Sequence, residues 1–279
     1  MGALHNHIRK IGYTEVEAPS FSGETSEGGS EVFKFDYFGK KAYLTQSWQF
    51  YAENLISVFE KVYAMAPSFR AEKSKTTRHL TEFWHFEVEA AWADMNDILQ
   101  VVAGCIQNAL KEVLTKNRNE LRILEVDDSR LENIKIPFPR VSYKEAIERL
   151  SKEGFGIKYG EDFGTLEEKR LAQDYNGFVA VTNYPLKILK FYHGEDPKNP
   201  DVGMNFNILV PGIWEVVDGS QREPDLHKIQ ERLKRANMDL GKSDWYLDSR
   251  MYGSVPHAGF VLGVDILFQW ICNLDDIKD

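Results

Sequence analysis

The sequence predicts an α+β fold in which an antiparallel sheet is flanked by helices. Segments typical of strands follow one another through hairpins or inserted helices, without the regular strand and helix alternation that indicates a parallel sheet. The chain has 279 residues, of which 43% are hydrophobic, and this is enough to bury a full core. We therefore expect residues 1–279 to form one domain.

The elements of the first half are predicted by periodicity and by the residues that interrupt it. Gly12 ends a first helix and Pro19 ends the strand that follows it, whereas Ser142 with Glu145 forms a capping box that opens a later helix. We expect helices at 4–11, 49–60, 95–116 and 142–152, and strands at 13–17, 31–34 and 40–45, with a hairpin over 68–89.

The second half predicts buried strands and two further helices. Short apolar runs between turn residues are typical of buried strands, and the last of these strands continues directly into a helix. We expect strands at 177–182, 204–210, 214–220 and 258–262, and helices at 224–237 and 264–272.

Composition excludes several classes of protein. The net charge of −9 argues against a broad nucleic-acid-binding surface, although residues 73–79 and 228–242 are locally basic. No apolar run is long enough to cross a bilayer and the N-terminus has no signal pattern, so we expect a cytoplasmic protein that does not bind membranes. Cys105 and Cys272 lie in apolar helical contexts and are expected to be buried thiols.

The hairpin at 68–89 carries the most chemical information. It consists of a strand with Arg70, a basic loop, and a return strand with Phe83. An arginine offers planar donors to a phosphate and a phenylalanine offers a stacking face, so the hairpin can hold a polyanion beneath a flat ring. The alternative is an exposed hairpin whose charges are only solvated.

The sequence of this hairpin resembles motif 2 of the class II aminoacyl-tRNA synthetases. That motif reads Phe-Arg-x-Glu, a variable loop, then Arg or His, three residues and Phe, and the matching residues here are Phe69, Arg70, Glu72, His79 and Phe83. The segments RAEKSKTTRHLTEF and FEVEAAW resemble the corresponding sequences of the asparaginyl-tRNA synthetases in particular. The resemblance covers residues 8–277 and implies a six- to seven-stranded antiparallel sheet with flanking helices.

The resemblance also implies a reaction and its partners. The expected activity is ATP-dependent activation of asparagine or aspartate as an aminoacyl-adenylate, with ATP and Mg²⁺ as cofactors. A tRNA partner and a homodimer are possible, although the anticodon-binding domain is expected to be absent and the first helix is short.

The resemblance assigns roles to individual residues. Arg70, Glu72 and Glu215 would be catalytic, and Glu215 and Asp265 would bind the metal. The ATP-binding residues would be Arg70, Glu72, Arg78, His79, Phe83, Glu215 and Ser220. The amino-acid-binding residues would be Glu27, Gln46, Gln49, Glu87 and Arg222.

Several positions depart from the family pattern. Motif 3 of the family contains a glycine where this chain has Val261, and an arginine that clamps the γ-phosphate where this chain has Ile266. Loss of a charge-assisted hydrogen bond removes about 1.5 to 3 kcal/mol. The full set of altered pocket residues is Trp48, His193, Trp214, Asp218, Val261 and Ile266.

Three interpretations follow. The chain activates asparagine; or it is a paralogue or redesigned scaffold whose ATP site has become an apolar pocket for another ligand; or it is a noncatalytic binding module. In the second case Trp48 and Trp214 would be walls of the pocket, and His193 could form an acid–base pair with Asp218 or Asp265. ATP binding separates the first interpretation from the other two.

Overall fold

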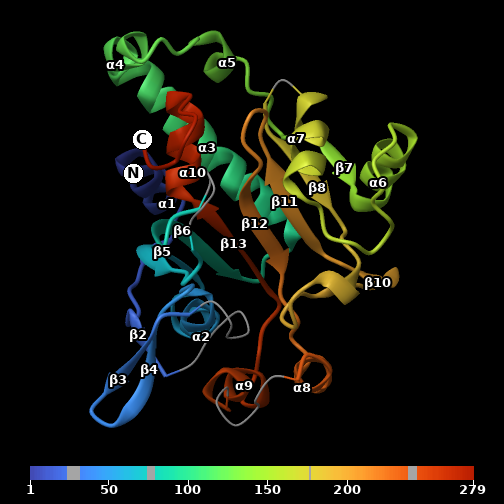
Figure 1. The fold of residues 1–279 in the computed structure, drawn as a ribbon. Coiled ribbons are helices and arrows are strands. Elements are labelled where there is room, and N and C mark those ends of the chain that lie inside the picture. Colours follow the sequence, from blue (N-terminus) through green and yellow to red (C-terminus); the bar gives the residue numbers. More distant parts are fainter. Residues whose placement is uncertain (24–31, 74–78, 176, 238–243) are drawn as a thin grey trace.

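The fold is built on one mixed sheet of eight strands (Figure 1). The structure is a computed structural model that describes residues 1–23, 32–73, 79–175, 177–237 and 244–279. The strands lie in the order β1 (Thr14–Glu15), β5 (Lys61–Phe69), β6 (Glu82–Ala91), β13 (His257–Gly263), β12 (Glu215–Gln221), β11 (Asn205–Leu209), β8 (Val179–Thr182) and β7 (Arg140–Ser142).

The α+β class is confirmed, but the sheet is mixed rather than purely antiparallel. Six central strands pair antiparallel, whereas β1 pairs parallel with β5 and β7 pairs parallel with β8 at the two edges. In both cases a long, helix-containing segment separates the two strands in the sequence. Such a segment can return the chain in the same direction, which a tight hairpin cannot do.

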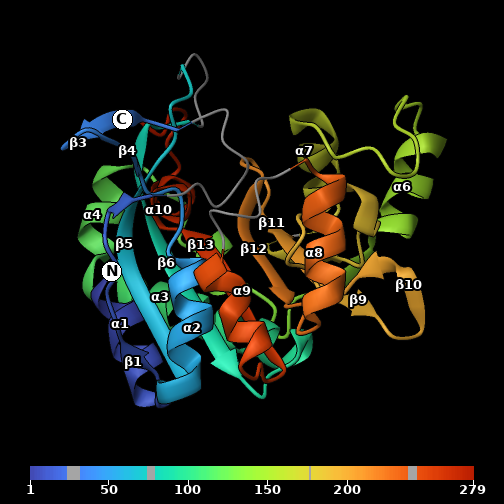
Figure 2. The same cartoon turned by 90° about the horizontal axis from the view of Figure 1, so that it is seen from below.

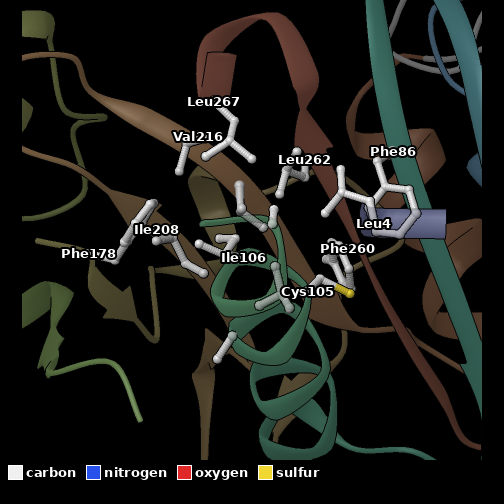
Figure 3. Close-up of a cluster of buried hydrophobic side chains, with 14 of the residues drawn as sticks. Leu4, Phe86, Cys105, Ile106, Phe178, Ile208, Val216, Phe260, Leu262 and Leu267 are labelled. Atoms are coloured by element: carbon white, nitrogen blue, oxygen red, sulfur yellow. The ribbon is translucent and has the colours of Figure 1, made fainter. Parts of the chain in front are cut away.

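One face of the sheet is covered by α1 (Gly2–Lys10), α3 (Met95–Lys116) and α10 (Val264–Cys272). Figure 3 shows Cys105 and Ile106 of α3 among side chains of the central strands, including Phe260, Leu262 and Ile208. These residues belong to the largest buried cluster of the described chain. The short helices α4 (Arg118–Ile123) and α5 (Ser129–Glu132) follow α3.

Helix capping explains where two of the predicted helices begin. Asp94 accepts hydrogen bonds from the amides of Asn96 and Asp97 at the start of α3, and Asp97 bonds back to the Asp94 amide. Ser142 and Glu145 form the predicted capping box of α6 (Tyr143–Lys152). Both boxes satisfy amide groups that would otherwise have no partner in the first turn of a helix.

Among the described residues, helices cover the opposite face mainly at its two ends. At one end α2 (Gln49–Phe59) packs on β5, and at the other end α6 and α7 (Thr165–Gln173) pack on β7, β8 and β11. Helix α2 lies in a row with α9 (Asp244–Met251) and α8 (Leu226–Arg235), as Figure 2 shows. The middle of this face, over β6, β13 and β12, is left for a cavity.

The remaining elements lie outside the main sheet. They are the three-stranded sheet of β2 (Phe21–Ser22), β4 (Lys40–Leu44) and β3 (Lys34–Tyr37), the pair β9 (Glu195–Asp196) and β10 (Asn199–Gly203), and a 3₁₀ turn at Leu186–Ile188.

Two composition-based expectations can be compared with the structure. Cys105 and Cys272 are buried free thiols, as predicted. Among the helices of the described ranges, none combines the length and the apolar character needed to cross a membrane.

Candidate functional site

A cavity of about 420 Å³ lies over the centre of the sheet. Alternate residues of a strand point to the same face, so residues two apart on β6 and on β13 share the floor of the cavity. Phe83 and His85 come from β6, Val261 and Gly263 from β13, and Asp218 from β12. Val261 stands directly opposite Asp218 on one side and Glu87 on the other.

Most of the residues predicted for a site line this cavity. They come from segments far apart in the sequence, which the sheet brings together. The lining includes Gln49, Arg70, Glu72, His79, Phe83, Trp214, Glu215, Asp218, Arg222, Val261, Asp265 and Ile266. The predicted residues Glu27 and Arg78 lie outside the described residues.

Trp48 does not line the cavity, and this corrects its predicted place as a wall. Its side chain is buried in a separate cluster with Ala52 and Ile56 of α2 and Val62 of β5. The Trp48 amide donates to the Glu87 carboxylate at 3.0 Å, which fixes the start of α2 on β6. The tryptophan is therefore part of the contact between helix and sheet.

His193 also lies outside the cavity lining, which corrects its predicted acid–base role. Its ring stacks on Tyr192 at 4.7 Å, and its Nδ1 lies 3.2 Å from the Lys190 carbonyl. Burial, together with the positive charge of Arg222, lowers the pKa of His193 to about 3. A neutral histidine that does not reach the cavity cannot pair with Asp218 or Asp265 across a ligand.

Three more predicted residues are buried outside the lining. Gln46 is 5% exposed, and Ser220 accepts a hydrogen bond from Arg222 at 2.8 Å. Glu87 accepts from the Ser47 hydroxyl at 2.8 Å and lies 3.3 Å from His85. Ser220 and Glu87 thus hold other residues in place, whereas the buried Oε1 of Gln46 has no hydrogen-bond partner in the described part of the chain.

One end of the cavity carries the residues of the hairpin. The Arg70 guanidinium lies 5.6 Å from the centre of the Phe83 ring, a cation–π arrangement. His79 lies 3.9 Å from the Glu72 carboxylate. A planar group and an attached phosphate could be held together at this end, because a ring face and a guanidinium lie side by side.

The other end of the cavity contains a buried ion pair. Arg222 donates to Glu89 from Nη2 at 3.0 Å and from Nε at 3.2 Å. Burial disfavours the charge on Arg222, but Glu89 and Glu53 outweigh this effect and raise the pKa of the guanidinium. A Cβ atom at Gly259 would collide with the Glu89 carboxylate and with the Val88 carbonyl, so a glycine is needed beside this pair.

A second buried network holds the α2 side of the cavity. The Glu53 carboxylate accepts hydrogen bonds from Gln49 at 2.8 Å and from Tyr246 at 2.9 Å, and it also binds Arg250 and His257. Gln49 lines the cavity, so its amide is positioned by a carboxylate that is itself fixed by α9 and by the start of β13.

An acidic wall faces the hairpin end. Burial raises the pKa of Glu215 well above its usual range, and the nearby carboxylates Asp218, Glu168 and Asp162 add to this effect. Arg70 acts in the opposite direction. Asp265, the predicted metal partner of Glu215, is instead held at 2.6 Å by the Trp84 amide.

This donor set fits a hard cation. Oxygen ligands suit Mg²⁺, which is usually bound by one or two carboxylates together with the phosphates of a substrate. Within the described ranges no three carboxylate, histidine or cysteine side chains are arranged to hold a metal by themselves. Glu215 and Asp218 can therefore supply the protein ligands, provided that a phosphate supplies the others.

The cavity is not an apolar pocket, even though Val261, Ile266 and Trp214 line it. Ten of its lining residues have carboxylate, guanidinium or imidazole side chains, and these are Arg70, Glu72, His79, His85, Asp162, Glu168, Glu215, Asp218, Arg222 and Asp265. This composition favours a charged ligand over an apolar one.

Several lining residues were missed from the sequence, among them Ser47, His85 and Tyr192. His85 could have been found, because alternation along β6 places it on the same face as Phe83 and Glu87. Asp162 and Glu168 come from α7 and the loop before it, where no local pattern indicates that they face a sheet.

Comparison with known proteins decides the family. The family described as "tRNA synthetases class II (D, K and N)" matches residues 1–279. The chain belongs to the class II tRNA synthetase family. The match over residues 1–279 therefore confirms the resemblance to this family that the hairpin at 68–89 indicated.

Individual relatives make the match more specific. The chain is 44% identical over 269 residues to an asparagine–tRNA ligase of Thermoplasma acidophilum, and the match covers 96% of this chain and 63% of that one. A crystal structure of asparaginyl-tRNA synthetase from Pyrococcus horikoshii complexed with asparaginyl-adenylate has 42% identity and a TM-score of 0.97, and the match covers 99% of this chain and 64% of that one.

More distant class II synthetases share the same fold. The asparaginyl-tRNA synthetase of Entamoeba histolytica in complex with asparaginyl-adenylate has 29% identity and a TM-score of 0.88, with 99% of this chain and 64% of that one covered. The class II synthetase chain described here thus spans a little under two thirds of the length of these relatives.

Proposed function

We propose that this chain activates asparagine with ATP, forming asparaginyl-adenylate and releasing pyrophosphate. The observation that carries the proposal is the cavity, which has a guanidinium beside a ring at one end and a buried arginine at the other. A relative whose fold matches with a TM-score of 0.97 was crystallised with asparaginyl-adenylate.

The proposed roles of the side chains follow from their places in the cavity. Phe83 stacks on the adenine, Arg70 binds the α-phosphate, and Glu72 with His79 holds the rest of the nucleotide. Arg222 and Gln49 lie at the other end, where the amino-acid side chain would bind. The two substrates are thereby aligned for in-line attack of a carboxylate oxygen on the α-phosphorus.

Both substrates are anionic, so the approach requires compensation of negative charge. Bound Mg²⁺ would neutralise phosphate charge, with Glu215 and Asp218 as its protein ligands. Arg70 would contribute positive charge at the nucleotide end, and His79 would contribute a further polar contact. The proposal also includes transfer of the amino acid to tRNA, a homodimer and a cytoplasmic location. These belong to the proposal because the chain covers only 63% of the asparagine–tRNA ligase that it matches.

The experiment that tests the proposal is asparagine-dependent exchange of pyrophosphate into ATP. We expect exchange with asparagine and much slower exchange with aspartate at the same concentration. No exchange at millimolar ATP and Mg²⁺ would contradict the proposed activation, and faster exchange with aspartate would change the substrate.

Restoring the family's motif 3 residues is expected to strengthen ATP binding. The double variant Ile266→Arg with Val261→Gly adds a guanidinium and removes a branched side chain at two positions that line the cavity. One charge-assisted hydrogen bond corresponds to a gain in affinity of about ten- to a hundredfold. Isothermal titration with ATP measures it.

The matched control is Ile266→Gln with Val261→Gly, because glutamine has a long polar side chain that carries no charge. An affinity gain in the arginine variant alone supports the charge argument. An unchanged titration in both variants would show that position 266 does not act on the nucleotide.

A further inference from the structure

His85 lies in the floor of the cavity and has no role in the proposed mechanism. It lies on β6 on the same face as Phe83 and Glu87, and it lines the cavity although only 8% of the residue is exposed. Its cross-strand neighbours, Gly263 on β13 and Ala66 on β5, are too small to cover the ring. The imidazole is therefore accessible to a bound molecule.

One ring nitrogen of His85 is fixed by the protein. Nδ1 lies 2.9 Å from the Ser68 hydroxyl and 3.3 Å from the Glu87 carboxylate. Glu87 is in turn held by the Ser47 hydroxyl at 2.8 Å and by the Trp48 amide at 3.0 Å. Such support fixes the orientation of the ring, and in the described part of the chain Nε2 has no hydrogen-bond partner.

This geometry excludes a serine nucleophile. In a Ser-His-acid triad the serine bonds to one ring nitrogen and the acid to the other, so that a proton can pass between them. Here Ser68 and Glu87 both approach Nδ1, and Ser68 is 2% exposed. Nε2 is therefore the ring nitrogen that remains for a ligand.

We propose that His85 binds a phosphoryl oxygen of the nucleotide by donating from Nε2, with Nδ1 accepting from the Ser68 hydroxyl. This proposal rests on the proposed function, which brings a nucleotide into the cavity. The phosphates would pass close to His85, because its ring touches Phe83 edge-on at 4.8 Å and Arg70 lies above the same phenylalanine. His85 thereby supplies a hydrogen-bond donor in a site where position 266 is isoleucine.

The test is isothermal titration of MgATP into the intact chain at neutral pH. His85→Asn keeps a polar group near Ser68 but has none at the position of Nε2, so we expect its dissociation constant to rise roughly tenfold, since one hydrogen bond to a charged group is lost. The longer amide of His85→Gln reaches the position of Nε2 and should restore part of the affinity.

Thermal unfolding of both variants is the control, because a merely structural role for His85 would lower the stability of the variants without separating them by their affinity for MgATP. A His85→Asn variant with the wild-type affinity would overturn this proposal and leave the proposed function standing. A wild type that binds no MgATP would overturn both.

Discussion

Replacing Arg70 with alanine is expected to reduce asparagine-dependent pyrophosphate exchange by about a hundredfold to a thousandfold, as loss of a preorganised donor to a developing charge usually does. Arg70 is the guanidinium that lies beside the Phe83 ring. It also lowers the pKa of Glu215, against burial and the neighbouring carboxylates, which raise it. Its removal therefore deprives the phosphate of a donor and removes the positive charge that favours the ionised form of Glu215.

The conservative variant Arg70→Lys separates these two effects. Lysine keeps the charge that acts on Glu215 but lacks the planar pair of donors, so we expect an intermediate rate. Thermal unfolding of both variants should match the wild type, because Arg70 lies at the end of β5 and outside the buried clusters. Exchange by Arg70→Ala at close to the wild-type rate would remove Arg70 from the proposed mechanism.

Replacing Glu53 with alanine is expected to lower the free energy of unfolding by about 3 to 5 kcal/mol, the usual cost of removing one partner from a buried ion pair. The side chains of Glu53 and Arg250 are both 0% exposed, and His257 and Tyr246 also bond to this carboxylate. The variant leaves these groups without their acceptor, and it joins α2, α9 and β13 less firmly. Urea unfolding at neutral pH measures the effect.

The control for this prediction is Glu112→Ala on α3. Glu112 pairs with Lys116 at 2.6 Å, but both side chains are substantially exposed, so the expected loss is only about 0.3 to 0.5 kcal/mol. Equal losses for the two variants would show that the buried network around Glu53 contributes nothing beyond a surface pair.

The same network predicts a direction of pH dependence. Burial alone would raise the pKa of Glu53, but Arg250 and His257 outweigh it and lower the pKa below its ordinary value. A carboxyl whose pKa is lowered in the folded state adds stability above its unfolded-state pKa and loses that contribution as the pH falls. The difference in stability between wild type and Glu53→Gln should therefore shrink in acid, and a constant difference would contradict this assignment.

The regular elements were predictable because their signals are local. The apolar stripe of α3 and the Ser142 capping box depend on residues within one helix, and both were found at the predicted bounds. The short edge strands β1 and β7 were harder to assign, because each pairs with a strand that lies beyond a long intervening segment. Their parallel pairing is a property of the assembled sheet.

The candidate site shows the same division. Arg70 and Phe83 were predicted from a motif in one hairpin, and the structure places both in the lining of the cavity. Trp48 was misplaced because its neighbours in the sequence line the cavity, whereas its own side chain turns beneath α2. The acidic wall around Glu215 could not be predicted, since Asp162 and Glu168 reach it only through the packing of α7 against the sheet.

Formation of the adenylate in a single turnover is the most direct measurement of the central claim. The protein would be mixed in excess with ATP labelled at the α-phosphate, with Mg²⁺ and asparagine, and the quenched products would be separated. We predict labelled asparaginyl-adenylate that appears only when asparagine is present and that Arg70→Ala fails to form. Unchanged ATP in a reaction that contains wild-type protein and asparagine would contradict the account.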